Sequence, residues 1–197
     1  LASNADVTLG DLTGRVAPLV IGWVMGPAMA GLFAVAQRAT VILAQPAQIL
    51  GNASYAELAH IVAGGYGGRA LRQTLLKVVG IAVLAAVPVV LIVGIFPTQI
   101  IRLMAGPAFG AASGVMIALV AARAVALIGP PCTSALTALG HPARSMWANL
   151  LSSFAFLPLL PWLLTTFGLM GAGIQAVAQA VVANGLLAVL VWRTSGR

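Results

Sequence analysis

The sequence between Arg144 and Arg193 contains no charged side chain and is overwhelmingly apolar. A water-soluble domain could not hide so much apolar surface, because surface area forces many side chains outward. A membrane-spanning helix needs ~20 mostly apolar residues, so this stretch is long enough for two. The whole chain follows the same pattern: 61% of its 197 residues are hydrophobic and 7% are charged, against about 25% charged in soluble domains. The sequence therefore predicts a polytopic membrane protein.

Apolar runs separated by turn residues predict a single all-α transmembrane bundle covering residues 1–197. No run alternates apolar and polar residues over the length of a strand, and a helix satisfies its own backbone hydrogen bonds in lipid. The six predicted spans are residues 6–26, 29–59, 73–96, 108–138, 144–166 and 170–192.

Glycine and proline mark the breaks between these spans. Met25-Gly26-Pro27-Ala28 and Ala105-Gly106-Pro107-Ala108 look alike and predict similar tight turns. Gly140-His141-Pro142 follows the fourth span, and Gly168 follows the fifth. Prolines inside several spans predict kinked helices, which are common in transporters. The alternative is that these prolines have no special role, because proline is frequent in membrane helices generally.

Basic residues are distributed unevenly between the loops. Arg102 lies in one set of alternate loops; the other set holds Arg69, Arg72, Lys77, Arg144, Arg193 and Arg197. Cytoplasmic loops carry the excess of Lys and Arg. Both termini are therefore predicted to be cytoplasmic. The Gly26–Ala30 turn, the Phe96–Pro107 segment and the Gly168 turn are predicted on the opposite side, which is the periplasm in the bacterial inner membrane that the family resemblance described below implies.

Three arginines fall inside predicted spans, where a charge is costly and usually faces a cavity or a partner. Arg38 and Arg123 have no acidic residue within a helical turn. Each either lines a substrate cavity and binds phosphate through its planar fork, or bonds groups on a neighbouring helix. Arg15 lies one helical turn after Asp11, so these two can pair, and the pair is also a candidate coupling-ion or proton site.

Amide side chains form stripes on two otherwise apolar spans. Gln45, Gln48 and Asn52 share one face of the second span, while Gln175 and Gln179 share a face of the sixth. We expect both stripes to turn toward a shared, hydrated substrate cleft. Hydrogen bonding between helices is the alternative.

Several classes of chemistry have no support in the sequence. There is no P-loop or H-E-x-x-H motif, and the acids Asp6, Asp11 and Glu57 all lie in the first third of the chain. The single cysteine, Cys132, excludes an internal disulfide. Basic residues scattered among apolar runs argue against nucleic acid as a partner. We expect no enzymatic activity, no cofactor and no metal site.

Four segments, in matching order, resemble the polysaccharide-repeat-unit flippases of the O-antigen type. Gly31–Arg38 is similar to a "G-[LI]-[YF]-x-[VL]-A-x-R" helix start, and Phe96–Phe109 to a "P-x-x-I-x-x-L-x-G-x-x-F" turn. Ala138–His141 resembles an "L-x-A-x-G" turn, and Phe167–Gly173 resembles "x-G-L-x-G-A-A". These flippases belong to the multidrug/oligosaccharidyl-lipid/polysaccharide exporter superfamily.

The resemblance implies a two-lobe exporter of about twelve helices, of which this chain looks like the carboxy-terminal lobe. It implies transport of undecaprenyl-pyrophosphate-linked oligosaccharide by alternating access, with an amino-terminal lobe and the lipid-linked sugar as partners. Arg38 matches a position that is often basic in the family. A cation-coupled multidrug exporter of the same superfamily and a non-transporting membrane assembly partner are the alternatives.

Overall fold

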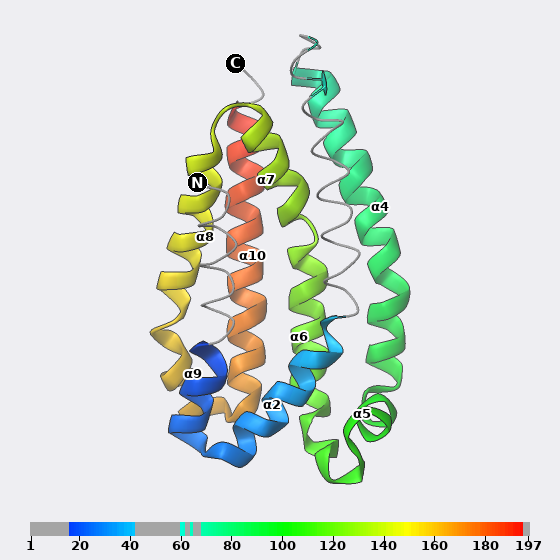
Figure 1. Ribbon diagram of the computed structural model, residues 1–197, viewed down its shortest axis with the longest axis vertical. Coiled ribbons are helices and arrows are strands. Elements are labelled where there is room, and N and C mark those ends of the chain that lie inside the picture. The colour runs from blue at the N-terminus through cyan, green and yellow to red at the C-terminus, as the bar shows by residue number, and fades with distance from the viewer. Residues whose placement is uncertain (1–15, 42–59, 62–63, 65–67, 195–197) are drawn as a thin grey trace.

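The computed structural model describes residues 16–41, 60–61, 64 and 68–194, and within them every regular element is a helix. This confirms the all-α class predicted from the sequence. Figure 1 shows the long helices side by side along the long axis of the molecule. After a first helix at Val16–Met25, the helices are α2 (Pro27–Ala39), α4 (Gly68–Ile95), α5 (Pro97–Ala105), η1 (Pro107–Ala112), α6 (Ser113–Ala126), α7 (Gly129–Ala138), α8 (Pro142–Phe156), α9 (Leu159–Phe167) and α10 (Leu169–Thr194).

Three helical stretches of the described chain are long and apolar enough to cross a membrane, namely α4, Pro107–Ala138 and α10. The pair α8 and α9 makes a fourth if it counts as one span, bent by 46° at its break. Pro158 stands at that break, where it caps the start of α9. These helices identify the chain as a membrane protein, and they coincide with the last four spans predicted from the sequence.

The first two predicted spans are described only in part. The described residues of the first form the short apolar helix Val16–Met25. Those of the second form α2, which has 13 residues and so falls short of the ~20 that a spanning helix needs. The remainder of both predicted spans lies outside the described residues.

Proline affects these helices in two ways. Pro88 lies inside α4, which is a continuous helix of 28 residues. The proline therefore does not break this helix. Pro27, Pro107 and Pro142 instead begin α2, η1 and α8. Proline is suited to that position because the first helical N–H has no partner within the helix.

The long helices alternate in direction and so define two ends of the bundle (Figure 1). The start of α4, the α7–α8 turn and the end of α10 lie at one end, which we call the basic end because Arg69, Arg72, Arg144 and Arg193 are there. The opposite end holds α5, η1 and the α9–α10 turn. The predicted cytoplasmic and periplasmic turns therefore segregate to different ends.

Two Gly-Pro turns at the opposite end have nearly the same backbone, as their sequences predict. Gly26 has φ 90° and ψ 166°, and Gly106 has φ 94° and ψ 171°. Residues with a side chain rarely adopt such a φ. Each glycine thus redirects the chain into a helix that begins at the following proline.

The core consists of two clusters stacked along the bundle. One joins the first helix, α2, α4, α5, α6, α9 and α10 around Ile21, Phe33, Ile101 and Met116. The other joins α4, α7, α8 and α10 around Leu71, Cys132, Leu136 and Leu187. The most extensive helix contact is between α6 and α10, where Gly173 lies so close to Ala118 that no side chain fits between them.

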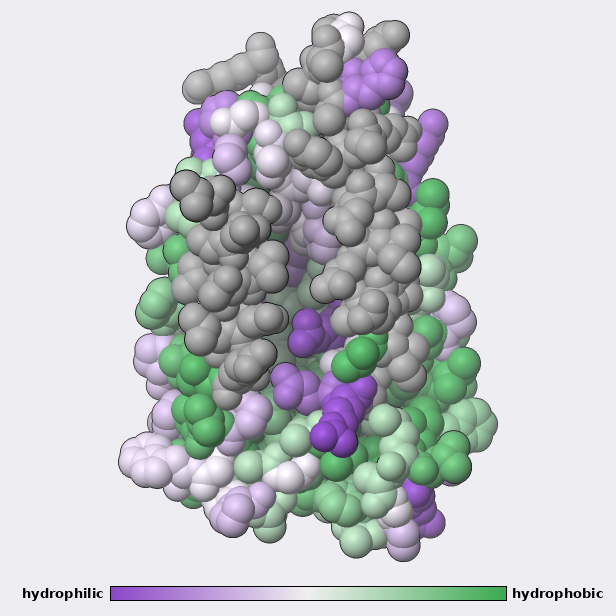
Figure 2. Space-filling model, viewed as in Figure 1, coloured by the Kyte–Doolittle hydropathy of each residue, from purple (hydrophilic) through white to green (hydrophobic). Residues whose placement is uncertain are grey.

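Apolar side chains also cover much of the outer surface. On α4, the residues Ile81, Leu84, Leu91 and Ile92 are exposed, with Leu84 reaching 74%. Figure 2 shows hydrophobic surface along the flanks of the molecule, with hydrophilic surface at the ends and in the middle of the face shown. Apolar flanks of this kind are suited to contact with lipid chains.

Candidate functional site

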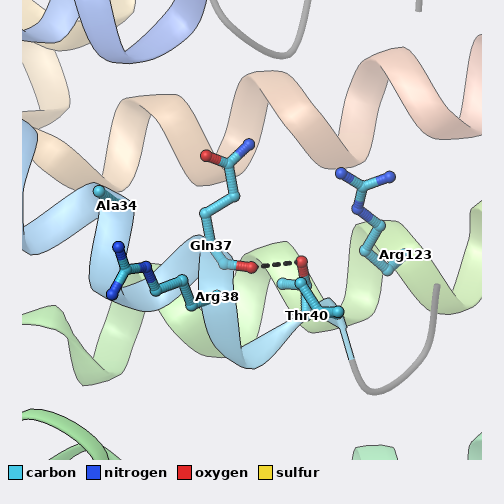
Figure 3. A pocket seen from close by; sticks show the side chains of 6 residues that line it. Ala34, Gln37, Arg38, Thr40 and Arg123 are labelled. Atoms are coloured by element: carbon cyan, nitrogen blue, oxygen red, sulfur yellow. Dashed lines mark hydrogen bonds between the residues drawn. The ribbon is translucent and has the colours of Figure 1, made fainter. Parts of the chain in front are cut away.

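Arg38 and Arg123, which are far apart in the sequence, line one hollow of about 320 Å³. We call it the central hollow; its other lining residues are Ala34, Gln37, Thr40 and Val41. In the close-up of Figure 3, Arg38 extends along α2 toward Ala34 while Arg123 rises from α6. The fold therefore brings together two arginines that the sequence proposes as cavity residues.

The end of α2 presents Gln37 and Arg38 to this hollow. Thr40 is 2% exposed, and its Oγ1 donates to the Gln37 carbonyl oxygen at 2.7 Å, as does its backbone N–H at 3.0 Å. Because these bonds occupy only the Gln37 main chain, the side-chain amide stays available to the hollow. Figure 3 shows that amide between the two guanidinium groups.

Arg123 is held at a fixed depth by the packing of α6. Its neighbours Leu119, Val120 and Ala122 are buried in the bundle, whereas Arg123 itself is exposed. It lies close to the midpoint of Pro107–Ala138, the long apolar stretch that contains α6. The guanidinium is therefore near the middle of a helix whose length suits a membrane crossing.

The charge of the central hollow is not compensated within the described part of the chain. There, no hydrogen bond or ion pair engages the guanidinium of Arg38 or Arg123. The acids of the chain, Asp6, Asp11 and Glu57, lie outside the described residues. A guanidinium group can bind the oxygens of a phosphate or pyrophosphate through paired hydrogen bonds, and both arginines line this one hollow.

The amide stripe of α10 does not line the central hollow. Gln175 Nε2 donates to Gln179 Oε1 at 3.0 Å, and Gln179 Nε2 donates to Ser153 Oγ on α8 at 3.1 Å. Gln175 is only 7% exposed. These contacts match the interhelical alternative raised for the stripe, because they join α10 to α8 within the bundle.

Other predicted site residues lie outside the described part of the chain: Gln45, Gln48, Asn52, Asp11 and Arg15. Within the described part, no group of three or more His, Cys, Asp or Glu residues is arranged to hold a metal ion. The sequence analysis did not single out Thr40, whose hydroxyl hydrogen-bonds the end of α2. Its spacing of three residues from Gln37 was the available signal.

Comparison with protein-family models, curated proteins and solved structures gave no match to this chain. The likeness to oligosaccharide flippases thus stays a prediction that rests on the sequence segments described above.

Proposed function

We propose that this chain is a six-helix lobe of an exporter that moves undecaprenyl-pyrophosphate-linked oligosaccharide across the bacterial inner membrane. The observation that carries the proposal is that Arg38 and Arg123 line the same central hollow. The resemblance of the sequence to polysaccharide-repeat-unit flippases supports the same substrate class.

The electrostatics favour an anionic substrate over a cationic one. Placing an arginine at the centre of a membrane helix costs about 2.5–3.5 kcal/mol on insertion scales. A pyrophosphate entering the hollow offsets part of that cost, because each guanidinium can form two parallel hydrogen bonds with its oxygens. A cationic drug would be repelled by the same pair, which argues against the multidrug alternative.

Transport requires the substrate cavity to open to one side of the membrane and then to the other. The polyprenyl chain stays in lipid beside the apolar flanks, while the pyrophosphate sits at the depth of Arg123. In this proposal a second, amino-terminal lobe closes the cavity, and rocking of the lobes exposes it first to the cytoplasm and then to the periplasm. The protein itself supplies binding and reorientation, with no covalent chemistry.

Export of surface polysaccharide by the bacterium that makes this protein tests the proposal. Arg38→Ala and Arg123→Ala should each reduce export by at least tenfold at unchanged protein level, whereas Arg38→Lys should recover part of it by restoring charge without the bidentate fork. Binding of purified protein to a polyprenyl pyrophosphate, compared with the matching polyprenyl alcohol, should fall in the same alanine variants.

Arg102→Ala is the matched control, because Arg102 is an exposed arginine of α5 at the opposite end and does not line the hollow. It should leave export and binding unchanged. Normal export by both alanine variants, or equal binding of pyrophosphate and alcohol, would show that the two arginines do not recognise the substrate.

A further inference from the structure

A second hollow, of about 400 Å³, lies at the basic end, between the α7–α8 turn and the end of α10. We call it the basic hollow. It is lined by His141, Arg144, Leu190, Arg193 and Thr194. In the sequence these basic residues served only as topology signals, but the fold gathers them around one space large enough for a phosphate group and its immediate substituents.

Arg144 is held in place by the end of α10. Its Nη1 donates to Thr194 Oγ1 at 3.1 Å, and that hydroxyl donates in turn to the Leu190 carbonyl oxygen at 2.7 Å. The Thr194 hydroxyl therefore presents its lone pairs to the arginine. A guanidinium has five N–H donors, so this single contact orients Arg144 while leaving donors for a ligand.

Two further side chains, Arg193 and His141, line the same hollow. Arg193 is exposed, and no hydrogen bond or ion pair engages its guanidinium in the described part of the chain. His141 Nδ1 lies 2.8 Å from the Leu139 carbonyl oxygen, so it is the donor, and Nε2 is left over. Arg72 does not line the hollow; it donates to the Trp192 carbonyl oxygen at 2.8 Å and stacks 4.3 Å from the Trp192 ring centroid.

The surroundings of the hollow point to a lipid headgroup as the source of the phosphate. The basic hollow lies where α10, a helix of membrane-crossing length, ends. Trp147, one turn after Arg144 on α8, is 66% exposed, and Trp192 is 53% exposed. Exposed tryptophans of this kind sit at the level of the headgroups, and Leu190 gives the hollow an apolar wall.

We propose that the basic hollow binds the phosphodiester of an anionic phospholipid, with Arg144 and Arg193 as the phosphate ligands. Such a lipid would join the start of α8 to the end of α10 at the membrane surface. The proposal is independent of what the central hollow transports, because it uses other residues at another depth.

Native mass spectrometry of the purified full chain, titrated with phosphatidylglycerol or phosphatidylcholine, tests this proposal. The wild type should retain phosphatidylglycerol in preference to phosphatidylcholine, and Arg144→Gln with Arg193→Gln should weaken that binding by about tenfold or more. Arg69→Gln with Lys77→Gln is the matched control, since it removes the same charge from exposed positions of α4 that do not line the hollow.

Three results would overturn the proposal. An equal loss of phosphatidylglycerol binding in the control double variant would show that only general surface charge matters. Displacement of phosphatidylglycerol by millimolar inorganic phosphate would assign the site to free phosphate. Unchanged binding in the Arg144 and Arg193 double variant would show that the basic hollow is not a lipid site. If that variant does not fold, Arg193→Gln alone decides, because in the described structure its guanidinium holds no other residue in place; it should still weaken lipid binding severalfold.

Discussion

Gly173→Ala tests the close contact between α6 and α10. A methyl group on Gly173 would lie 2.6 Å from Ala118 Cβ, which is 0.8 Å short of the 3.4 Å at which ordinary contacts begin (3.4 − 2.6). The helices α6 and α10 must move apart to accept it, and overpacking of this kind costs about 1–3 kcal/mol. Gly185→Ala on the same helix meets nothing within 4 Å, so it shares only the gain in helix propensity of about 1 kcal/mol.

The two variants should therefore differ in stability by about 2 kcal/mol, which is roughly 4–8 °C in the unfolding midpoint for a chain of this size. The midpoint can be followed with a thiol-reactive fluorophore, because Cys132 is the only cysteine and is 1% exposed. Adding Ala118→Gly should restore much of the loss, because it deletes the methyl group that the new side chain meets. Equal midpoints for Gly173→Ala and Gly185→Ala would refute the close approach of α6 and α10.

Two further predictions concern the orientation of the chain in the membrane and the effect of Arg123 on stability. In a Cys132→Ser background, Ala108→Cys places a thiol at the opposite end and Ala143→Cys places one at the basic end, both at exposed positions. An impermeant thiol reagent applied to intact cells should label Ala108→Cys and spare Ala143→Cys. The reverse labelling pattern would show that the proposed topology is inverted. In nanodiscs without substrate, Arg123→Leu should raise the unfolding midpoint by a few degrees, because an uncompensated mid-membrane charge destabilises the protein. A lower midpoint would show instead that Arg123 makes a bond that stabilises the fold.

Much of the fold was predictable because lipid imposes a simple rule on the chain. A helix that crosses a membrane must be long and apolar, so the spans around α4, α6 with α7, α8 with α9, and α10 appear directly as long, mostly hydrophobic runs. The Gly26 and Gly106 turns were predictable for a different reason. Proline cannot continue a hydrogen-bonded turn, and glycine alone readily takes the positive φ that precedes it.

The candidate site was only half predictable. An arginine in an apolar helix is conspicuous in any sequence, so Arg38 and Arg123 stood out individually, but their meeting depends on how α2 crosses α6. For Gln175 and Gln179, helical periodicity placed both amides on one face of α10. It did not say which helix faces them, and the partner Ser153 on α8 is an ordinary residue without a local motif.

The distribution of charge separates the arginines by what can neutralise them. Within the described part of the chain, every Asp, Glu, Lys or Arg side chain is a Lys or an Arg. At the basic end, headgroups and counter-ions reach Arg144 and Arg193 from the membrane surface at all times. At the depth of Arg123, lipid chains offer no anion, so in the proposed function an anionic ligand that enters the hollow compensates this charge. The protein therefore bears an electrostatic cost at the central hollow that it does not bear at the basic end. If the proposed function is correct, this cost is retained because binding must be strong enough to draw a pyrophosphate out of the interface, and Arg123→Leu should then stabilise the fold while reducing export.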